Sequence, residues 1–498
     1  MKIKKLIGNF NDPGKTLSQR VVRSGFWVFL LRITERVFSL IRLVILARIL
    51  SPNDFGLMGI ALLTMATLDT FSQTGFQQAL IQKKEDIKPY LDSAWTVLIL
   101  RGFILFAILF FIAPYAATFF NAPQAKPIIQ VIGLAVLFQA FTNIGVIYFQ
   151  KELEFNKQFI YQISGTLADF IVAISAALIL KSVWALALGL LAGNFVRLVV
   201  SYLIHPYRPH LTFDLGKAKE LFGFGKWILG SSILVFLYTQ GDDVFVGKLI
   251  GTTALGFYQM AYRISLIPVR EITLVISQVS FPAFSKLQDQ LVKLRVGYLK
   301  ILKINNFITI PLAAMIFFFS YDFTYLILGK KWLPIVPLLK IFSIMIILAV
   351  VNANTGSLYN AVGKPFISVK SQVIRTIVMF SIIYPLVVRL GIMGAASASL
   401  ISEIMVTPYL TYKVLKIIEC KFKDFGQTIF FPLIASIIAV LVQFILKNVL
   451  LSSLTLVNLI TLTCIGAVVY VTVINFFERI SSYSLFQELK EVKVKMME

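Results

Sequence analysis

Five polar side chains interrupt an otherwise apolar segment, residues 22–48, at steps of one to four positions: Arg32, Glu35, Arg36, Ser39 and Arg42. On an α-helix, at about 100° per residue, they fall within an arc of roughly 120°. Guanidinium groups bind phosphate oxygens through two hydrogen bonds at once, and three arginines against one glutamate leave net positive charge. The pattern predicts a hydrated cationic strip that binds an anionic headgroup. The alternative is a structural role, in which Glu35 pairs with Arg32 or Arg42.

A second apolar segment, residues 256–282, carries polar side chains on one face at nearly seven-residue spacing: Gln259, Arg263, Arg270 and Ser277. We expect Arg263 and Arg270 to line the same cavity as the first strip, because charges inside a membrane face water or a partner. For Arg270 the alternative is an ion pair, either with its neighbour Glu271 or with an acid from another segment. Glu271 is itself a candidate for gating or ion coupling.

Acidic side chains also lie within apolar segments. Asp242 and Asp243, in residues 227–249, are candidates for gating or ion coupling. Three further carboxylates are candidates for carrying a coupling proton or sodium ion, although a hydrogen-bonded packing role is favoured for each: Asp69, Asp169 and Glu403. Four basic side chains are expected to extend toward an interface: Arg101, Arg197, Lys340 and Arg375. His205 and His210 are expected to be solvated.

The composition indicates which elements must position these side chains. Of 498 residues, 58% are hydrophobic, 13% aromatic and only 14% charged, and the mean hydropathy is +0.83. Soluble domains carry about a quarter charged residues, so a soluble multidomain enzyme is excluded. The strands of an outer-membrane barrel alternate polar and apolar residues, which these long apolar runs do not. The chain is therefore predicted to be an all-α polytopic membrane protein.

A membrane-spanning helix needs about 20 mostly apolar residues. That rule predicts about fourteen transmembrane helices, at roughly 22–48, 56–80, 94–118, 128–149, 159–180, 183–204, 227–249, 256–282, 304–328, 333–360, 367–388, 391–412, 426–446 and 454–477. The first is expected to be retained, because residues 1–23 lack the apolar core and cleavage site of a signal peptide.

The net charge of +23 is placed as the positive-inside rule expects. With the N terminus taken as cytoplasmic, 29 lysine and arginine residues lie in segments on that side and 8 on the other. Both termini are therefore predicted to be cytoplasmic. A nucleic-acid binder would gather its basic residues on one soluble face, so that class is excluded. Cys420 and Cys464 lie in a basic loop and an apolar run, which fits neither a disulfide framework nor a zinc site.

The two halves match at an offset of 200 residues. Gly25-Phe26-Trp27 aligns with Gly225-Lys226-Trp227, and Gly56 aligns with Gly256 within longer similar segments. Six predicted spans in each half make the repeats parallel, a plan in which substrate sites lie where the two lobes meet. The offset also aligns Arg42 with Asp242, which predicts a cross-lobe ion pair that closes one side of the cavity. The alternative is that both residues lie near the outer boundary and are simply solvated.

The predicted organisation follows from these spans. It comprises a cytoplasmic N-terminal segment (1–21), an N-lobe (22–204), a cytoplasmic linker (205–226), a C-lobe (227–412), a cytoplasmic loop (413–425), two further spans (426–477) and a cytoplasmic tail (478–498).

No catalytic constellation stands out. Pro13-Gly14-Lys15-Thr16 resembles the end of a phosphate-binding loop, but the preceding glycine is one residue too far away and no apolar strand comes before it. No loop is large enough for a soluble active site. The sequence therefore favours a transporter over an enzyme, with no metal site and no catalytic residues.

Several segments resemble a known family: Ala47–Met58, Ala79–Gln82, Gln150–Phe155 and, most specifically, Gly256–Arg263 followed by Ile267-Pro268 and Phe281-Pro282. Together they resemble the polysaccharide-exporting branch of the multidrug/oligosaccharidyl-lipid/polysaccharide exporter superfamily, the O-antigen and exopolysaccharide flippases. The resemblance covers about residues 20 to 480. It implies two six-helix lobes around a V-shaped central cavity, with two extra C-terminal helices.

The resemblance also implies a function. A flippase of this kind moves a polyprenyl-pyrophosphate-linked oligosaccharide from the cytoplasmic to the outer leaflet of the cell membrane, for lipopolysaccharide O-antigen, capsule or exopolysaccharide synthesis. No cofactor is expected beyond coupling to protons or sodium ions. Expected partners are the lipid-linked oligosaccharide and membrane lipids, with a polysaccharide polymerase and glycosyltransferases as candidates. Three alternatives remain: a peptidoglycan-precursor flippase, a cation-coupled multidrug exporter and a membrane-embedded glycan-processing enzyme.

Overall fold

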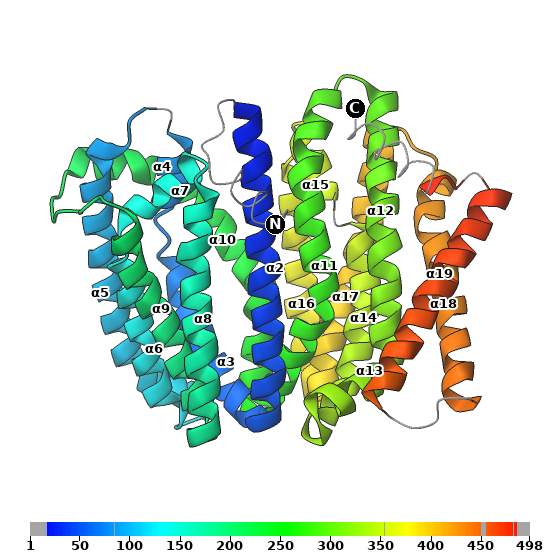
Figure 1. The fold of residues 1–498 in the computed structure, drawn as a ribbon, viewed down its shortest axis with the longest axis horizontal. Coiled ribbons are helices and arrows are strands. Elements are labelled where there is room, and N and C mark those ends of the chain that lie inside the picture. The colour runs from blue at the N-terminus through cyan, green and yellow to red at the C-terminus, as the bar shows by residue number, and fades with distance from the viewer. Residues whose placement is uncertain (1–16, 84, 353, 450–454, 482, 486–498) are drawn as a thin grey trace, which may run out of the picture. The chain divides into compact units, whose positions relative to one another are not determined.

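The structure is a computed structural model of the chain. It describes residues 17–83, 85–352, 354–449, 455–481 and 483–485. Every regular element in this part of the chain is a helix (Figure 1), which confirms the all-α prediction.

The chain divides into two compact units by its internal contacts. Among the described residues, unit 1 comprises those up to residue 240 together with 251–256, and unit 2 comprises 241–250 together with those from 257 onward. The long helices α10 (Leu215–Leu249) and α11 (Thr252–Leu287) contribute to both units.

The elements that lie wholly in unit 1 are α2 (Leu17–Ile49), α3 (Pro52–Phe71), α4 (Phe76–Gln82), α5 (Lys88–Phe119), α6 (Ala125–Ala140), η1 (Ile144–Val146), α7 (Ile147–Lys151), α8 (Phe155–Leu180) and α9 (Trp184–Ile204). Among them, α8 packs against α2 and α9, and α6 packs against α3, α5 and α9.

The elements that lie wholly in unit 2 are α12 (Leu291–Phe318), α13 (Ser320–Phe323), η2 (Thr324–Leu328), η3 (Lys330–Ile335), α14 (Val336–Val351), α15 (Thr355–Ala361), α16 (Phe366–Leu390), α17 (Ile392–Ile418), α18 (Phe422–Val449) and α19 (Leu456–Ile480). Among them, α12 packs against α14 and α18, and α17 packs against α14 and α16.

The number of membrane spans differs from the fourteen predicted. Nine described helices are long and apolar enough to cross a membrane, or ten if the bent pair α6 and η1–α7 counts as one span. The other four predicted spans correspond to α2, α10, α11 and α17. These segments are helical, but their composition is less apolar than that of a typical membrane span. They hold most of the candidate charged residues. The prediction of fourteen spans is therefore not confirmed, although a helix occupies each predicted position.

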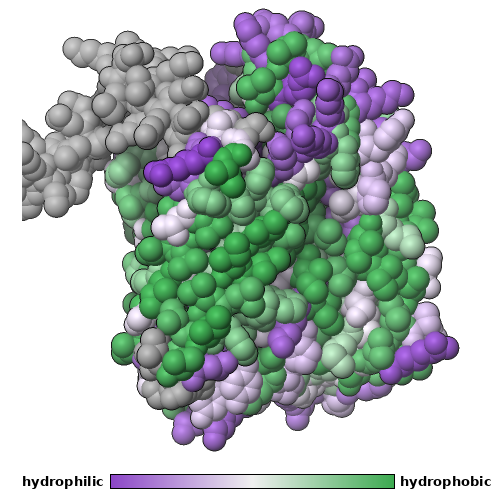
Figure 2. Space-filling view, turned by 90° about the vertical axis from the view of Figure 1, so that its right-hand side faces the viewer, coloured by the Kyte–Doolittle hydropathy of each residue, from purple (hydrophilic) through white to green (hydrophobic). Residues whose placement is uncertain are grey.

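The outer surface of unit 2 is suited to a lipid environment. Figure 2 shows, on the side of α18 and α19, a broad apolar belt with hydrophilic residues at both ends. Large apolar side chains on these two helices are exposed, among them Leu441, Phe444 and Val457. A patch of this size in contact with water would be an aggregation hazard, whereas lipid accepts it.

Two of the spans predicted in unit 1 are interrupted. The segment 56–80 breaks between α3 and α4, where Gly75 adopts a left-handed backbone with φ of 67° that favours glycine. The segment 128–149 bends by 70° between α6 and the following η1–α7 helices. At that bend the side chain of Asn143 accepts a hydrogen bond from the Gly145 backbone, 2.9 Å long, in place of a helical carbonyl.

The start of α3 is fixed by local sequence. Ser51 precedes Pro52, and a residue before proline favours the extended backbone observed for Ser51, with ψ of 159°. The Ser51 hydroxyl accepts from the Asp54 backbone while the Asp54 carboxylate accepts from the Ser51 backbone, which is a capping box. Asp54 also accepts from the backbone of Val183, 2.9 Å away, so one residue fixes the starts of two helices.

Candidate functional site

The predicted cationic strip lies on α2, and its members have different surroundings. Arg32 is exposed, and its side chain has no partner among the described residues, whereas Glu35 and Arg36 are half-buried. Arg42 donates from Nη2 to Asp169 Oδ1 on α8, 2.8 Å away. Among the described residues of unit 1, the ion-pair partner of Arg42 is thus Asp169 and not Glu35, because the packing of α2 against α8 brings Asp169 to it. The cross-lobe pair of Arg42 with Asp242 stays a prediction.

Asp242 and Asp243 form a buried acidic pair in unit 2. Both are nearly inaccessible, with 5% and 7% exposure. Asp242 accepts from the hydroxyl of Tyr258 at 2.5 Å, and Asp243 accepts from the amide of Gln259 at 2.8 Å. The hydroxyl of Ser399 lies 3.4 Å from Asp242. Among the described residues, neither carboxylate forms an ion pair with a lysine or an arginine.

The burial of Asp242 rules out the alternative raised for it, because this carboxylate is not solvated at a boundary. Two adjacent carboxylates in a dry site cannot both be ionised without a counter-charge, because burial and mutual repulsion both oppose it. Their neutral partners supply hydrogen bonds but no positive charge. The pair is therefore suited to hold a proton or a small cation.

Two further acids within the described helices, Asp69 and Glu403, are paired with arginine, so both have the hydrogen bonds that the favoured packing role requires. Arg101 on α5 donates to Asp69 on α3, with 2.5 Å between Nη2 and Oδ1. Arg375 on α16 donates to Glu403 on α17 at 2.9 Å, and Glu403 is only 2% exposed. The prediction that Arg101 and Arg375 extend to an interface was wrong, because a carboxylate on a neighbouring helix lies within reach of each.

The second predicted arginine-bearing face is described only in part. Arg263 on α11 is exposed, as a cavity-lining residue must be. Gln259, the first residue of the same face, is turned to Asp243. The side chains of Arg270 and Glu271 lie outside the described residues, and their predicted roles remain predictions.

Two ion pairs join segments that are far apart in the sequence, and neither was predicted. Lys447 on α18 contacts both carboxylate oxygens of Asp322 at 2.7 Å. Lys83 contacts Glu220 at 2.6 Å, and this contact is the largest cause of the raised pKa of the Lys83 ammonium. No local pattern could have revealed these pairs, because each joins residues more than a hundred positions apart.

His205 also departs from expectation, since it is half-buried rather than solvated. Its ring stacks on that of Tyr148 with 5.6 Å between ring centroids, and its Nδ1 accepts from the backbone of Tyr207 at 3.1 Å. Burial is the main cause of its lowered pKa, so the ring is held neutral as an acceptor that joins α7 to the segment after α9.

A further group of polar side chains lies in residues 73–78, which include the turn after α3 and the first residues of α4. The sequence did not single it out as a site. The sequence does contain an indication of this group, because three glutamines and a threonine occur within six residues of a chain that is 58% hydrophobic. The described part of the chain contains no group of three or more histidine, cysteine, aspartate or glutamate residues that could hold a metal ion.

The fold defines the class of protein. The solved structure of the lipid II flippase MurJ, in an inward closed conformation, is similar to this chain with a TM-score of 0.72 at 16% sequence identity, over 90% of this chain and 98% of that one. The chain therefore has the fold of a polytopic membrane transporter.

The family follows from the sequence comparison. Residues 45–337 match the family model described as polysaccharide biosynthesis protein. The chain belongs to this family, the polysaccharide flippases of the multidrug/oligosaccharidyl-lipid/polysaccharide exporter superfamily, and it is a transporter rather than an enzyme.

Two relatives extend along much of the chain. The lipopolysaccharide biosynthesis protein WzxC of Escherichia coli K12 is 27% identical over 87% of this chain and 89% of its own length. The succinoglycan biosynthesis transport protein ExoT of Rhizobium meliloti is 23% identical over 66% of each chain.

Proposed function

We propose that the protein flips a polyprenyl-pyrophosphate-linked oligosaccharide from the cytoplasmic to the outer leaflet of the cell membrane, for surface polysaccharide synthesis. Both termini are cytoplasmic in this proposal, as the distribution of lysine and arginine favours. The names of the relatives support the pathway, since WzxC acts in lipopolysaccharide biosynthesis and ExoT in succinoglycan biosynthesis.

The observation that carries the proposal is the exposure of Arg32 and Arg263 on two long helices of a membrane protein. An arginine at the centre of a bilayer costs about 2.5–3.5 kcal/mol on insertion scales, so such a side chain faces water rather than lipid. Arg32 has no side-chain partner among the described residues, which leaves its guanidinium able to bind an incoming anion.

A pyrophosphate suits such a site. It carries several negative charges and presents oxygens in the spacing that a guanidinium contacts with two hydrogen bonds. The hydroxylated head would cross in the hydrated, cationic cavity while the prenyl tail stays in lipid. An organic cation would be repelled by the same charges, which disfavours a drug exporter.

We further propose that Asp242 and Asp243 carry the coupling cation, a proton or a sodium ion. Their support is the burial of both carboxylates, whose partners in the described part of the chain are all neutral. Binding of a cation would neutralise the pair, and its release would restore repulsion. That difference is what an ion gradient needs in order to bias two conformations.

The proposal is tested with the purified protein in liposomes that contain the native lipid-linked oligosaccharide. A membrane-impermeant glycan-modifying enzyme outside reports how fast the lipid changes leaflet. We expect Arg32→Ala and Arg263→Ala each to slow this movement by about tenfold or more, the effect of losing one charged hydrogen bond of about 1.5–3 kcal/mol.

Arg389→Ala is the matched control, because Arg389 is exposed in the last turn of α16 and belongs to no predicted site. Undiminished movement in both arginine variants would exclude the cationic cavity. A wild-type protein that moves a peptidoglycan precursor but not this lipid would favour the first alternative. Chemical alteration of the lipid would contradict the transporter function itself.

A further inference from the structure

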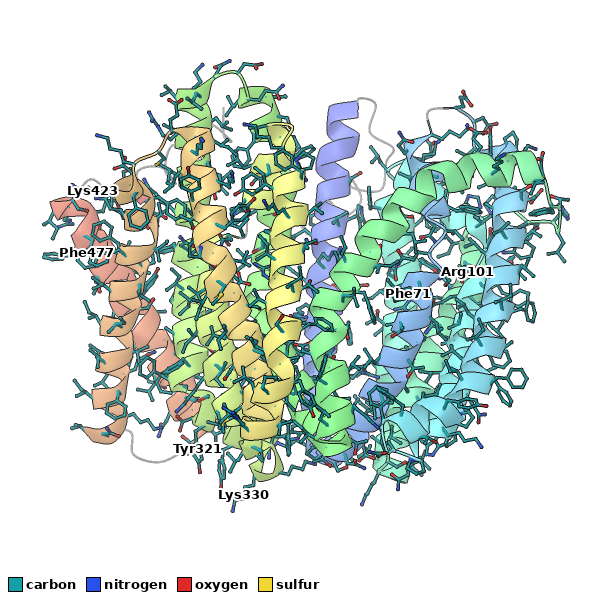
Figure 3. The ribbon with its side chains drawn as sticks, turned by 180° about the vertical axis from the view of Figure 1, so that it is seen from behind. Phe71, Arg101, Tyr321, Lys330, Lys423 and Phe477 are labelled. Carbon is teal, nitrogen blue, oxygen red and sulfur yellow. The ribbon has the colours of Figure 1, made fainter. Side chains whose placement is uncertain are left out.

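Unit 1 contains a polar cavity of about 240 Å³ that the function proposed above does not use. It lies between the end of α3, the segment 72–75, α4, α5 and α6, and all of its lining residues belong to unit 1. Figure 3 shows Arg101, which lines the cavity, between the two ends of the long helices of unit 1. Arg101 lies thirteen residues into α5, which is about 20 Å at 1.5 Å per residue.

The cavity is hydrated despite this depth. The side chain of Asp69 is 47% exposed and that of its partner Arg101 is 20% exposed. Charged groups at this level of a membrane protein cannot face hydrocarbon, so they face water. The volume accommodates about eight water molecules at roughly 30 Å³ each.

The lining has unused hydrogen-bonding capacity. The side chains of Gln73, Thr74, Gln77 and Gln78 have no hydrogen-bond partner among the described residues. Gln139 on α6 is held from the other side, because its amide donates to Asn194 at 3.0 Å. Several amide and hydroxyl groups, which both donate and accept, are thus directed to one space.

The net charge of the cavity decides what it can bind. Its only charged pair, among the described lining residues, is Asp69 with Arg101, and the two neutralise each other. A pyrophosphate needs excess positive charge and an organic cation needs excess negative charge, so neither suits this lining. A neutral polyhydroxylated group does, because each hydroxyl both donates and accepts, and the apolar side chains of Phe76 and Leu98 can cover a sugar ring face.

The size limits the ligand to a small unit. Sites for drug-sized ligands are about 300–1,000 Å³, and this cavity is smaller. We propose that it is a glycan subsite that binds one sugar residue of the lipid-linked oligosaccharide, and that the glutamines of residues 73–78 set which sugar is accepted. The inference rests on the proposed function, since the sugar is part of the lipid that the protein moves.

The direct test is binding of the soluble glycan. The oligosaccharide is released from the native lipid by mild acid, and its contact with the detergent-solubilised full-length protein is measured by saturation-transfer NMR and titration. We expect Gln77→Leu and Gln78→Leu each to weaken binding by about tenfold, as loss of hydrogen bonds in a polar site does. Both side chains are exposed, so neither change should disturb folding.

Gln82→Leu is the matched control, because Gln82 is an exposed glutamine at the end of the same helix α4 and does not line the cavity. Equal binding by wild type and both pocket variants would overturn the inference, as would the absence of any glycan binding to the wild type.

Measurement of lipid translocation in liposomes distinguishes failure of the glycan subsite from failure of the proposed flippase function. If the lipid is moved but the variants bind the glycan normally, only the subsite is wrong. If the glycan binds and the variants weaken it while no lipid is moved, the subsite stands and the flippase function falls.

Discussion

Three candidate acidic residues within the described helices follow one rule, and an adjacent pair is the exception. Asp69, Asp169 and Glu403 each contact an arginine on a neighbouring helix. Such pairs satisfy buried charges but contribute little net stability, because desolvation offsets the attraction. Asp242 and Asp243 are the exception, since their described partners are a tyrosine, a serine and a glutamine. An acidic pair without a counter-charge is the place where a mobile cation changes the energy most.

The first prediction at this scale concerns that pair. Asp242→Asn and Asp243→Asn each remove one negative charge with little change of shape, so neither variant retains the repulsion between two carboxylates that a bound cation would relieve. We expect a proton or sodium gradient to accelerate lipid movement by the wild type, and each variant to lose that acceleration. Translocation in liposomes with and without each gradient measures it.

Asp214→Asn is the control for this prediction, because Asp214 lies in the exposed segment before α10. If both buried variants respond to the gradient as the wild type does, the coupling role of the pair is excluded.

Two helices approach each other through aligned glycines. A Cβ on Gly56 of α3 would lie 1.7 Å from the carbonyl oxygen of Thr252, and a Cβ on Gly256 of α11 would lie 2.0 Å from the carbonyl oxygen of Pro52. The hydroxyl of Thr252 also donates to the side chain of Asn53. All of these residues belong to unit 1. The two glycines that the offset of 200 aligns are thus in direct contact through their backbones.

This contact gives a prediction for α3. Gly56→Ala places a methyl group against backbone atoms, which cannot move aside as a flexible side chain can. We expect destabilisation of about 1–3 kcal/mol, the range for overpacking, and a lower thermal midpoint of the detergent-solubilised protein. Gly25→Ala on α2 is the control, since nothing lies within 4 Å of its added Cβ. An unchanged midpoint for Gly56→Ala would show that the close approach is absent in solution.

At the scale of the molecule, polar groups concentrate at the two ends of the helices. In unit 2, Lys423 lies at one end of the helices and Tyr321 and Lys330 at the other (Figure 3), and an apolar belt lies between hydrophilic ends (Figure 2). The lysine and arginine distribution predicts that the end with Lys423 is cytoplasmic, because basic segments are retained on that side.

This orientation is testable by cysteine labelling. On a background with Cys420→Ser and Cys464→Ala, the single substitutions Lys330→Cys and Lys423→Cys are treated in intact cells with a membrane-impermeant thiol reagent. We expect the first to react and the second to react only after the membrane is permeabilised. The reverse pattern would contradict the predicted orientation and, with it, the direction of transport.

Much of the fold could be predicted because membrane helices are encoded locally. A run of about 20 apolar residues specifies a helix whatever surrounds it, since every backbone group must be hydrogen-bonded within the segment. The Ser51–Asp54 capping box and the aligned glycines are equally local signals. The exact span count was less predictable, because helices such as α2 and α10 carry charges that only a hydrated or paired environment tolerates.

The sequence by itself determined that the chain is a helical membrane protein, which residues are charged within its helices, and which family it resembles. Only the tertiary structure decided which charges neutralise each other: Arg42 with Asp169, Arg101 with Asp69, and Arg375 with Glu403. It also gathered the glutamines of residues 73–78 around one cavity. The physical reason is that partners on different helices meet through packing, and no local spacing records which helix will lie alongside.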